Sequence, residues 1–475
     1  MLQNIVNGNR RVRFAARVAS RKRSPKKPIL LYMSSPGEDS PATLRQSPSI
    51  RNSRDWRGDS SQLAAFRESR SNQALYYLLL FLLFFWLLYL RRSAQLLHPQ
   101  VWDEDGTQVI PGLLVHGWKS LFYPVNGYLI FVPKAISAVS LSISGLYYPI
   151  VSTIFAWIFV AGVCVAISVC PIALRGGPLL GVFTLLIPSD PEVFGIPLYT
   201  FWWASLLLFL VALWNPRSTG IKWRFTFIIL GGLSSPIIFL VTPFLVLRAI
   251  LFRQKRGEIA MLVAALLCCS AQAVAMLHPA APLAAGLLNA HNLKQVLPKL
   301  IGGYLVGNFV RTTDHLVWIA TSVFLAFVLL LIPFFRRSPW YLYLIALWCG
   351  TVYFIASRVD LSILQLRVSG PRYFFLPFVL LAWFLVSVLS EGEHFGIRAF
   401  AAVLLFASIL NMLPVRSRPQ RDFHWSEQLA DCGRADPFPM EISFDGLRPW
   451  FVQLNRSECR ALQQAGWIHL NSPVR

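Results

Sequence analysis

Residues 74–90 read ALYYLLLFLLFFWLLYL and contain no charged side chain. A helix of this length rises about 25 Å, close to the ~30 Å hydrocarbon thickness of a bilayer. Helices satisfy their own backbone in lipid, and the alternating pattern of a membrane β-barrel is not evident. Similar apolar stretches recur at 146–170, 192–214, 258–277, 315–335, 340–357, 372–390 and 396–413.

The composition supports a membrane protein. Of the 475 residues, 55% are hydrophobic and only 14% are charged, whereas soluble chains have about a quarter charged residues. The mean hydropathy is +0.53. The net charge of +22 comes from basic residues in the N-terminal tail and in short loops between apolar stretches, as membrane topology requires. We therefore expect no nucleic-acid partner.

The sequence predicts an all-α polytopic membrane protein with about eleven transmembrane helices. Residues 1–72 are polar, rich in Ser and Arg, and are expected to form a disordered cytoplasmic tail. Residues 73–413 would form the transmembrane domain, in which 93–145 is the first outer loop. Residues 414–475 would form a small tail on the outer face. The bilayer itself is the first expected partner.

Basic loops set the predicted topology, because positive residues favour the cytoplasmic side. Residues 225–252 lie between two such loops and must cross twice or form a re-entrant hairpin, with a break at 231–236. Between 124 and 192 either 124–144 lies along the outer surface and 177–188 crosses, or the reverse. Arg91 and Arg92 fall on the outer side against the rule, outweighed by the larger upstream basic cluster. The expected cytoplasmic loops are 215–224, 253–256, 336–337 and the loop ending at Arg398.

The first outer loop carries the main candidate site. Asp103, Glu104 and Asp105 are three consecutive carboxylates, and their mutual repulsion is most easily offset by a bound cation or a catalytic role. A carboxylate at the membrane boundary can act as a general base. Glu104 and Asp105 could also hold a divalent cation such as Mg²⁺ or Mn²⁺. For other outer acidic residues, such as Asp190 and Glu192, loop solvation is the simpler interpretation.

Basic and aromatic residues of the outer loops are candidates for substrate contacts. Lys134, Arg311 and Arg372 could bind a phosphate group. Tyr128 could stack on a sugar, although anchoring at the lipid interface is the commoner role of such aromatics. His116 shares the loop with the carboxylates, where a surface histidine is the simpler alternative.

The seven cysteines and eight histidines show no metal-binding spacing. Cys432 and Cys459 lie in the predicted outer tail and could either form a disulfide in an oxidising compartment or remain free.

The motif Trp102-Asp103-Glu104-Asp105-Gly106, the segment 120–129 and Pro133-Lys134 together resemble a bacterial branch of GT-C class membrane glycosyltransferases. That branch reads roughly W-x-E-D-G, then L-F-x-P-x-x-G-Y-L, then P-R. Lys134 keeps the charge of the usual Arg but loses its fork geometry. Weaker similarities are Ser235-Pro236 through Arg248, and Arg372-Tyr373. The resemblance covers most of 95–390.

The resemblance implies a multi-pass enzyme of the bacterial plasma membrane, with the N-terminus cytoplasmic and the C-terminus outside. It would transfer a sugar from a polyprenyl phosphate to a glycan or glycolipid acceptor on the outer face. Glu104 and Asp105 match the family motif and become the base or metal ligands, whereas Asp103 falls at its variable position. Arg372 and Lys134 become phosphate contacts. The alternatives are a transporter or flippase for a lipid-linked glycan, and a non-catalytic membrane scaffold.

Overall fold

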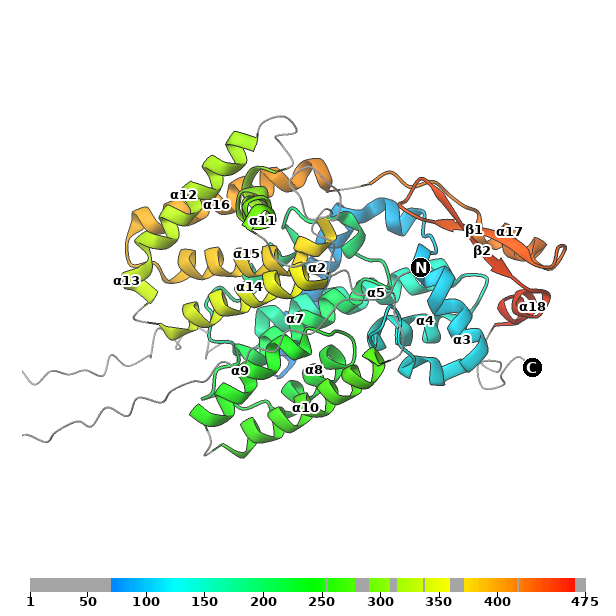
Figure 1. Cartoon of the computed structure of the whole chain (residues 1–475), viewed down its shortest axis with the longest axis horizontal. Coiled ribbons are helices and arrows are strands. Elements are labelled where there is room, and N and C mark those ends of the chain that lie inside the picture. Colours follow the sequence, from blue (N-terminus) through cyan, green and yellow to red (C-terminus); the bar gives the residue numbers. More distant parts are fainter. Residues whose placement is uncertain are drawn as a thin grey trace, which may run out of the picture. The chain divides into compact units, whose positions relative to one another are not determined.

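The computed structural model describes residues 70–252, 255–277, 290–307, 314–335, 338–358, 371–416 and 418–465. The predicted N-terminal tail, 1–72, lies almost wholly outside these residues. The described chain is mainly helical (Figure 1). The prediction of a helical membrane domain is therefore confirmed at the level of fold class.

The first half of the chain forms helices of very unequal length. Long helices follow the apolar stretches, whereas short helices occur where proline and glycine interrupt them. The elements are α2 (Arg70–Leu97), η1 (Asp105–Val109), α3 (Ile110–His116), η2 (Gly117–Phe122), α4 (Phe131–Ile143), α5 (Tyr148–Val169), α6 (Pro178–Leu185), η3 (Pro191–Val193), α7 (Thr200–Ala212), α8 (Ile221–Gly232), α9 (Ile238–Leu251) and α10 (Arg256–Met276).

The second half of the chain is also helical, except near its end. The final elements include two short strands, so the predicted all-α class is wrong for this small part. The elements are α11 (Ala290–Val306), α12 (Asp314–Leu330), α13 (Ile332–Phe335), α14 (Pro339–Arg358), η4 (Pro371–Phe374), α15 (Phe375–Glu391), α16 (Phe395–Met412), η5 (Leu413–Val415), α17 (Trp425–Asp431), β1 (Phe438–Ser443), β2 (Pro449–Leu454) and α18 (Arg456–Gln464).

Helices α7 and α15 form the centre of the helical body (Figure 1). Every residue of α7 is buried, and so is α15 from Phe375 to Val388. A helix that is apolar on all sides must be surrounded by protein or lipid. Here α5, α8 and α9 pack on α7, whereas α6, α14 and α16 pack on α15. The apolar side chains of α2, by contrast, are largely exposed, as expected for a helix facing lipid.

Six described helices are long and apolar enough to cross a membrane. By length and composition they define a multi-pass integral membrane protein. Shorter apolar helices of 10–17 residues accompany them, so the predicted total of eleven crossings stays a prediction. The spanning candidates are Asn72–Leu97, Tyr148–Val169, Arg256–Met276, Pro339–Ala356, Arg372–Glu391 and Phe395–Val415.

The predicted apolar stretch 192–214 is not one helix. Helix α7 begins only at Thr200, because Pro197 interrupts the stretch. Gly195 has a φ of +98°, and a Cβ there would lie 2.0 Å from the indole nitrogen of Trp157. The loop before α7 therefore packs tightly against α5.

The predicted break within 225–252 is confirmed: α8 ends at Gly232 and α9 begins at Ile238. The two open alternatives between 124 and 192 correspond to α4 and α6, and neither is among the six long spans. Helix α6 has only eight residues, a rise of about 12 Å, which is too short to cross a bilayer.

A buried ionic group joins α8, α9 and α10 at the far end of α7. Glu258 accepts hydrogen bonds from Arg224 at 3.0 and 2.8 Å and from Arg248 at 3.1 and 3.0 Å. Arg248 also donates to the carbonyl oxygens of Ala212 and Trp214, at 3.1 and 2.7 Å. One carboxylate thus connects the ends of four helices.

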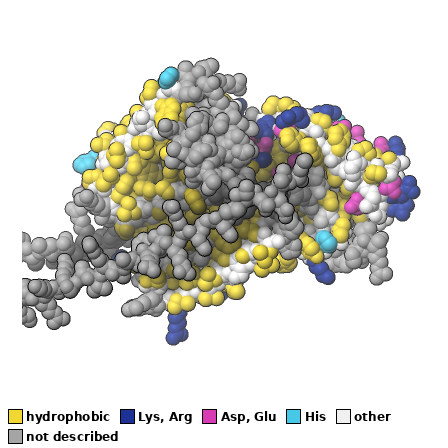
Figure 2. Space-filling view, viewed as in Figure 1, with side chains coloured by type: hydrophobic (Ala, Val, Ile, Leu, Met, Phe, Trp, Pro, Cys, Tyr) yellow, Lys and Arg dark blue, Asp and Glu magenta, His cyan; other side chains and the backbone are white. Residues whose placement is uncertain are grey.

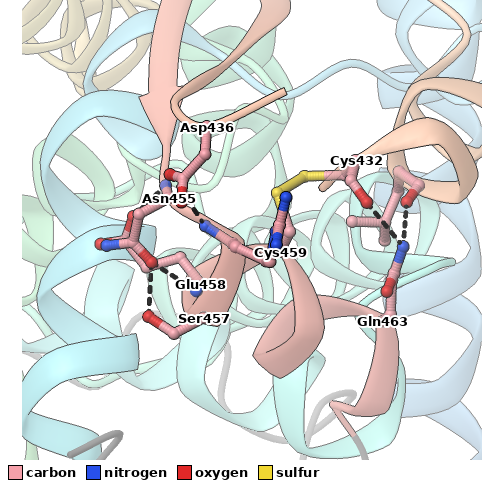
Figure 3. The surroundings of a disulfide bond; sticks show 9 residues. Cys432, Asp436, Asn455, Ser457, Glu458, Cys459 and Gln463 are labelled. Atoms are coloured by element: carbon pink, nitrogen blue, oxygen red, sulfur yellow. Dashed lines mark hydrogen bonds between the residues drawn. A yellow bond between two sulfur atoms is a disulfide. The ribbon is translucent and has the colours of Figure 1, made fainter. Parts of the chain in front are cut away.

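Residues 418–465 form a small α/β unit that we call the appendage. Strands β1 and β2 pair antiparallel, with Phe438 opposite Leu454 and Ser443 opposite Pro449. Of the two alternatives left open for Cys432 and Cys459, the structure shows the disulfide, which connects the residue after α17 to the first turn of α18 (Figure 3). The side-chain amide of Gln463 donates to the Cys432 carbonyl at 3.2 Å beside this bond.

Candidate functional site

The acidic motif lies where the first loop meets the appendage. Asp105 begins the π-helical turn η1, and the Gly106 amide donates to the Trp102 carbonyl at 2.8 Å. Strand β1 packs directly on this turn, since a Cβ at Gly106 would lie 2.5 Å from Ile442 Cδ1. The Ser443 amide donates to the Val101 carbonyl at 2.9 Å. Appendage and motif are therefore one packed unit.

Asp105 points into the protein. Its side chain is buried, Oδ2 accepts the Leu198 amide at 3.4 Å, and Oδ1 has no hydrogen-bond partner among the described residues. Burial raises the pKa of Asp105 to about 8, and the neighbouring charge of Glu104 acts in the same direction. Asp105 is therefore mainly uncharged at neutral pH, which reduces the repulsion within the motif.

Glu104 and Asp103 lie within the field of Arg372. Burial raises the pKa of Glu104, while the positive charge of Arg372 opposes this shift. The pKa of Asp103 is raised by burial and again opposed by Arg372. A carboxylate with a raised pKa is a better general base than an ordinary surface carboxylate.

Arg372 reaches the site from the first turn of the segment that leads into α15. Its Nη1 donates to the Tyr199 hydroxyl at 2.6 Å and to Glu192 at 3.3 Å. The Trp102 ring contacts the Tyr199 ring edge-on, with centroids 6.5 Å apart. Tyr199 therefore connects the motif to Arg372.

The appendage contributes a second arginine. Arg418 Nη2 donates to both carboxylate oxygens of Asp190, at 3.1 and 3.2 Å, and its Nη1 donates to Glu192. The pKa of Glu192 is raised by burial and by the charge of Asp190, against the two arginines. We call the seven residues that meet here the charge cluster: Asp103, Glu104, Asp105, Asp190, Glu192, Arg372 and Arg418.

Arg91 holds the loop that carries Asp190 and Glu192. Its guanidinium donates to the carbonyl oxygens of Leu185, Ile187 and Ser189, at 2.7, 2.8 and 3.1 Å. It also lies 3.8 Å over the ring of Phe194. The charge that contradicts the positive-inside rule is therefore buried in protein rather than exposed in a loop.

Two of the predicted substrate contacts, Lys134 and His116, lie beside η2. Lys134 is buried, and its ammonium donates to the carbonyl oxygens of Ser120 and Tyr123, at 2.8 and 2.9 Å. His116 is exposed and stacks on Tyr123, with ring centroids 4.3 Å apart. The two carbonyl contacts of Lys134 hold the end of η2 against α4, so its role here is structural.

Tyr128 contacts the ring of Phe201 edge-on, with centroids 6.0 Å apart. Phe201 also lies 6.4 Å from Tyr199, so Tyr128 is two rings away from the charge cluster. Arg311 lies outside the described residues.

The sequence analysis missed Tyr199 and Arg418 as site residues and favoured loop solvation for Asp190 and Glu192. The spacing of Asp190 and Glu192, two residues apart around Pro191, was the only available signal. Nothing in the sequence links Arg418 to residues near 190.

The proposed divalent cation fits this site only in part. Glu104 Oε2 and Asp105 Oδ1 are buried without partners, and Mg²⁺ takes one or two carboxylates when phosphate supplies other ligands. However, the described residues contain no group of three or more His, Cys, Asp or Glu placed to hold a metal ion. The described residues therefore do not form a complete metal site here.

An apolar cavity of about 150 Å³ opens along α15. It lies between α11, α12, α14 and α15, and its walls include Ile301, Phe324, Trp348 and Leu380. Leu380 is eight residues beyond Arg372, a distance of about 12 Å along a helix. The same helical segment thus carries a cation at one end and a hydrocarbon-lined groove further along.

No protein-family model matches this chain, and neither a curated protein nor a solved structure shows significant similarity to it.

We expect Asp105→Asn to change how stability depends on pH. The carboxyl pKa is about 8 in the fold, against an ordinary value of 3.8. A raised acid pKa stabilises the fold fully below about pH 4, and this contribution is lost as pH rises towards 8, by up to about 1.4 kcal/mol per pH unit. The melting temperature of purified Asp105→Asn protein should therefore increasingly exceed that of wild type across this window.

Asp436→Asn, at an exposed position of the appendage, provides the control and should follow the wild-type curve. A constant difference between Asp105→Asn and wild type from pH 4 to 8 would show that Asp105 is charged in the fold.

Proposed function

We propose that this protein is a membrane glycosyltransferase that moves a sugar from a polyprenyl phosphate to a hydroxyl of a glycan or glycolipid on the outer face. The observation that carries the proposal is that the positive charge of Arg372 acts on the half-buried Glu104, while Arg372 itself is bonded to Glu192 in the same cluster. A base and a phosphate-binding cation are the two groups that this reaction needs.

Glu104 is the proposed general base. Its carboxylate takes the proton of the acceptor hydroxyl as that oxygen forms a bond to the anomeric carbon of the sugar. The bond from this carbon to the phosphate oxygen breaks, and the lipid phosphate leaves with the electron pair. The proton passes from Glu104 to solvent, which restores the site. Asp105 is mainly uncharged at neutral pH, because its pKa is raised to about 8, so it adds little repulsion to the charge on Glu104.

Arg372 is the proposed contact of the departing phosphate. A guanidinium offers two parallel donors to a phosphate and stabilises its developing charge. The apolar cavity along α15 is a suitable place for part of the isoprenoid chain, since Leu380 in its wall is about 12 Å along the helix from Arg372 and its lining is hydrocarbon. Arg372 is held by Tyr199 and Glu192, so it is already oriented before substrate binds.

The test compares lipid-linked and surface glycans of cells with and without the gene. The proposal expects cells without the gene to lose one sugar from the surface glycan and to accumulate its polyprenyl-phosphate donor. Loss of the surface sugar with donor accumulating only on the cytoplasmic face would indicate a flippase. Identical glycans would overturn the proposal.

We further propose that the charge cluster faces the outer side, as the disulfide of the appendage suggests. Helix α7 runs from Thr200, next to the cluster, to Ala212, next to Arg248, so the loop after α7 lies at its opposite end. In a chain whose free cysteines are replaced, Gln108→Cys should react with an impermeant thiol reagent in intact cells. Thr219→Cys should react only after lysis. The reverse pattern would invert the topology.

A further inference from the structure

The appendage carries a polar groove of about 510 Å³ on its own surface. It is bordered by α17, by β1 and by the segment before α17. Figure 2 shows charged side chains of both signs gathered at the end of the molecule where Figure 1 places α17, α18, β1 and β2. This distinguishes the appendage from the apolar surface of the helices.

The groove lining alternates hydrogen-bond acceptors and donors. Four carboxylates line it together with the guanidinium groups of Arg421 and Arg434. Several of these charges are near one another, as in Arg434–Asp431 at 2.9 Å and Arg421–Glu441 at 3.8 Å. Sugar hydroxyls both donate and accept, so they suit such a mixed lining better than an ion of one sign does. The four carboxylates are Asp422, Glu427, Asp431 and Glu441.

The charge of the groove is opposite to that of the chain. Its four carboxylates outnumber its two arginines, whereas the whole protein has a net charge of +22. Acidic polymers would be repelled by the excess of carboxylates. The lining therefore selects against phosphate-rich or uronic acid-rich ligands and in favour of glycans without acidic groups.

One extended segment connects the groove to the charge cluster. Arg418 binds Asp190 and Glu192, and Arg421, three residues later, already lines the groove. Three extended residues span about 10 Å. The Phe423 amide, also in the groove wall, donates to the Gln100 side chain at 3.3 Å, just ahead of the acidic motif. The groove and the cluster are thus neighbours along the chain, joined by the short segment from Arg418 to Arg421.

We propose that this groove binds a glycan chain that lacks acidic groups and holds it with its reacting end towards the charge cluster. The identification of this glycan as the acceptor rests on the function proposed above, whereas binding itself does not. The groove would select the acceptor by its distal sugars, while Glu104 acts on the terminal hydroxyl.

The test uses the purified full-length protein on an array of neutral, amino-containing and uronic acid-containing oligosaccharides. We expect binding to glycans of the first two groups and none to the third. Glu427→Gln/Asp431→Asn removes two groove charges at nearly constant volume and should weaken binding at least tenfold. Asp436→Asn, an exposed carboxylate of the appendage outside the groove lining, should bind as wild type does.

Two further measurements separate the outcomes. A melting temperature equal to that of wild type shows that the double variant is folded, so that a loss of binding is not a loss of fold. Glycan binding and sugar transfer are measured separately, so that binding without transfer would contradict the proposed function and leave the groove proposal standing. No binding to any oligosaccharide, binding only to acidic ones, or equal binding by wild type and the groove variant would each overturn the proposal.

Discussion

Glu104→Gln should lower the amount of transferred sugar by about 10²- to 10⁴-fold, the usual effect of removing a general base. The amide has nearly the shape of the carboxylate but cannot take the acceptor proton. Burial raises the pKa of Glu104, and Arg372 lies close enough to oppose that shift. The measurement is the surface glycan of cells that carry only the variant, compared with cells without the gene. Membrane abundance of the variant should equal that of wild type.

Glu393→Gln is the matched control, because Glu393 is an exposed glutamate just beyond the other end of α15. It should leave the glycan unchanged. Glu104→Asp keeps the acid but shortens its reach and should retain part of the activity. A normal glycan in the Glu104→Gln strain would contradict the proposed enzymatic function without affecting the assignment as a membrane protein.

The second large effect concerns folding. Glu258→Gln should destabilise the protein by about 3–5 kcal/mol, because it leaves Arg224 and Arg248 buried without their counter-charge. Both arginines are bonded to the Glu258 carboxylate. The expected observations are a lower melting temperature and a reduced amount of protein in the membrane.

Replacing all three residues by apolar ones, as in Arg224→Leu/Arg248→Met/Glu258→Leu, should recover much of the lost stability. Glu391→Gln serves for comparison, because its partner Arg175 is half exposed and lies 3.4 Å away. That single change should cost less, since solvent screens the half-exposed Arg175 and the Gln amide can still accept the Tyr341 hydroxyl. An equal loss of stability in Glu258→Gln and Glu391→Gln would show that the buried ionic group is not what holds these helix ends together.

The sequence predicted the membrane helices well, because a bilayer imposes a length and an apolar composition on each span. It failed for 192–214, where the apolar residues of η3 and the loop before Thr200 are buried by packing against α5 rather than by lipid. Apolar side chains look the same in both environments. An apolar stretch in the sequence can therefore be longer than the helix it contains, when protein rather than lipid buries part of it.

The site was predictable only where it is local. The motif at Asp103, Glu104 and Asp105 is visible in the sequence, and so is Arg372 as a cation ahead of an apolar stretch. The contact of Arg418 with Asp190 depends on the path of the chain after α16, which no periodicity encodes. Lys134 shows the opposite case. The sequence suggests it as a phosphate contact, but its ammonium is bonded to two backbone carbonyl groups.

The position of Arg418 in the chain also bears on the order in which the molecule is assembled. All six long apolar helices precede it, so a growing chain holds Asp190 and Glu192 side by side before this cation has been synthesised. Until then Arg372 can pair with Glu192, but Asp190 lacks the guanidinium that bonds both of its oxygens. A polypeptide that stops before residue 418 would keep Asp190 in this state, with a buried carboxylate that has lost its ion-pair partner.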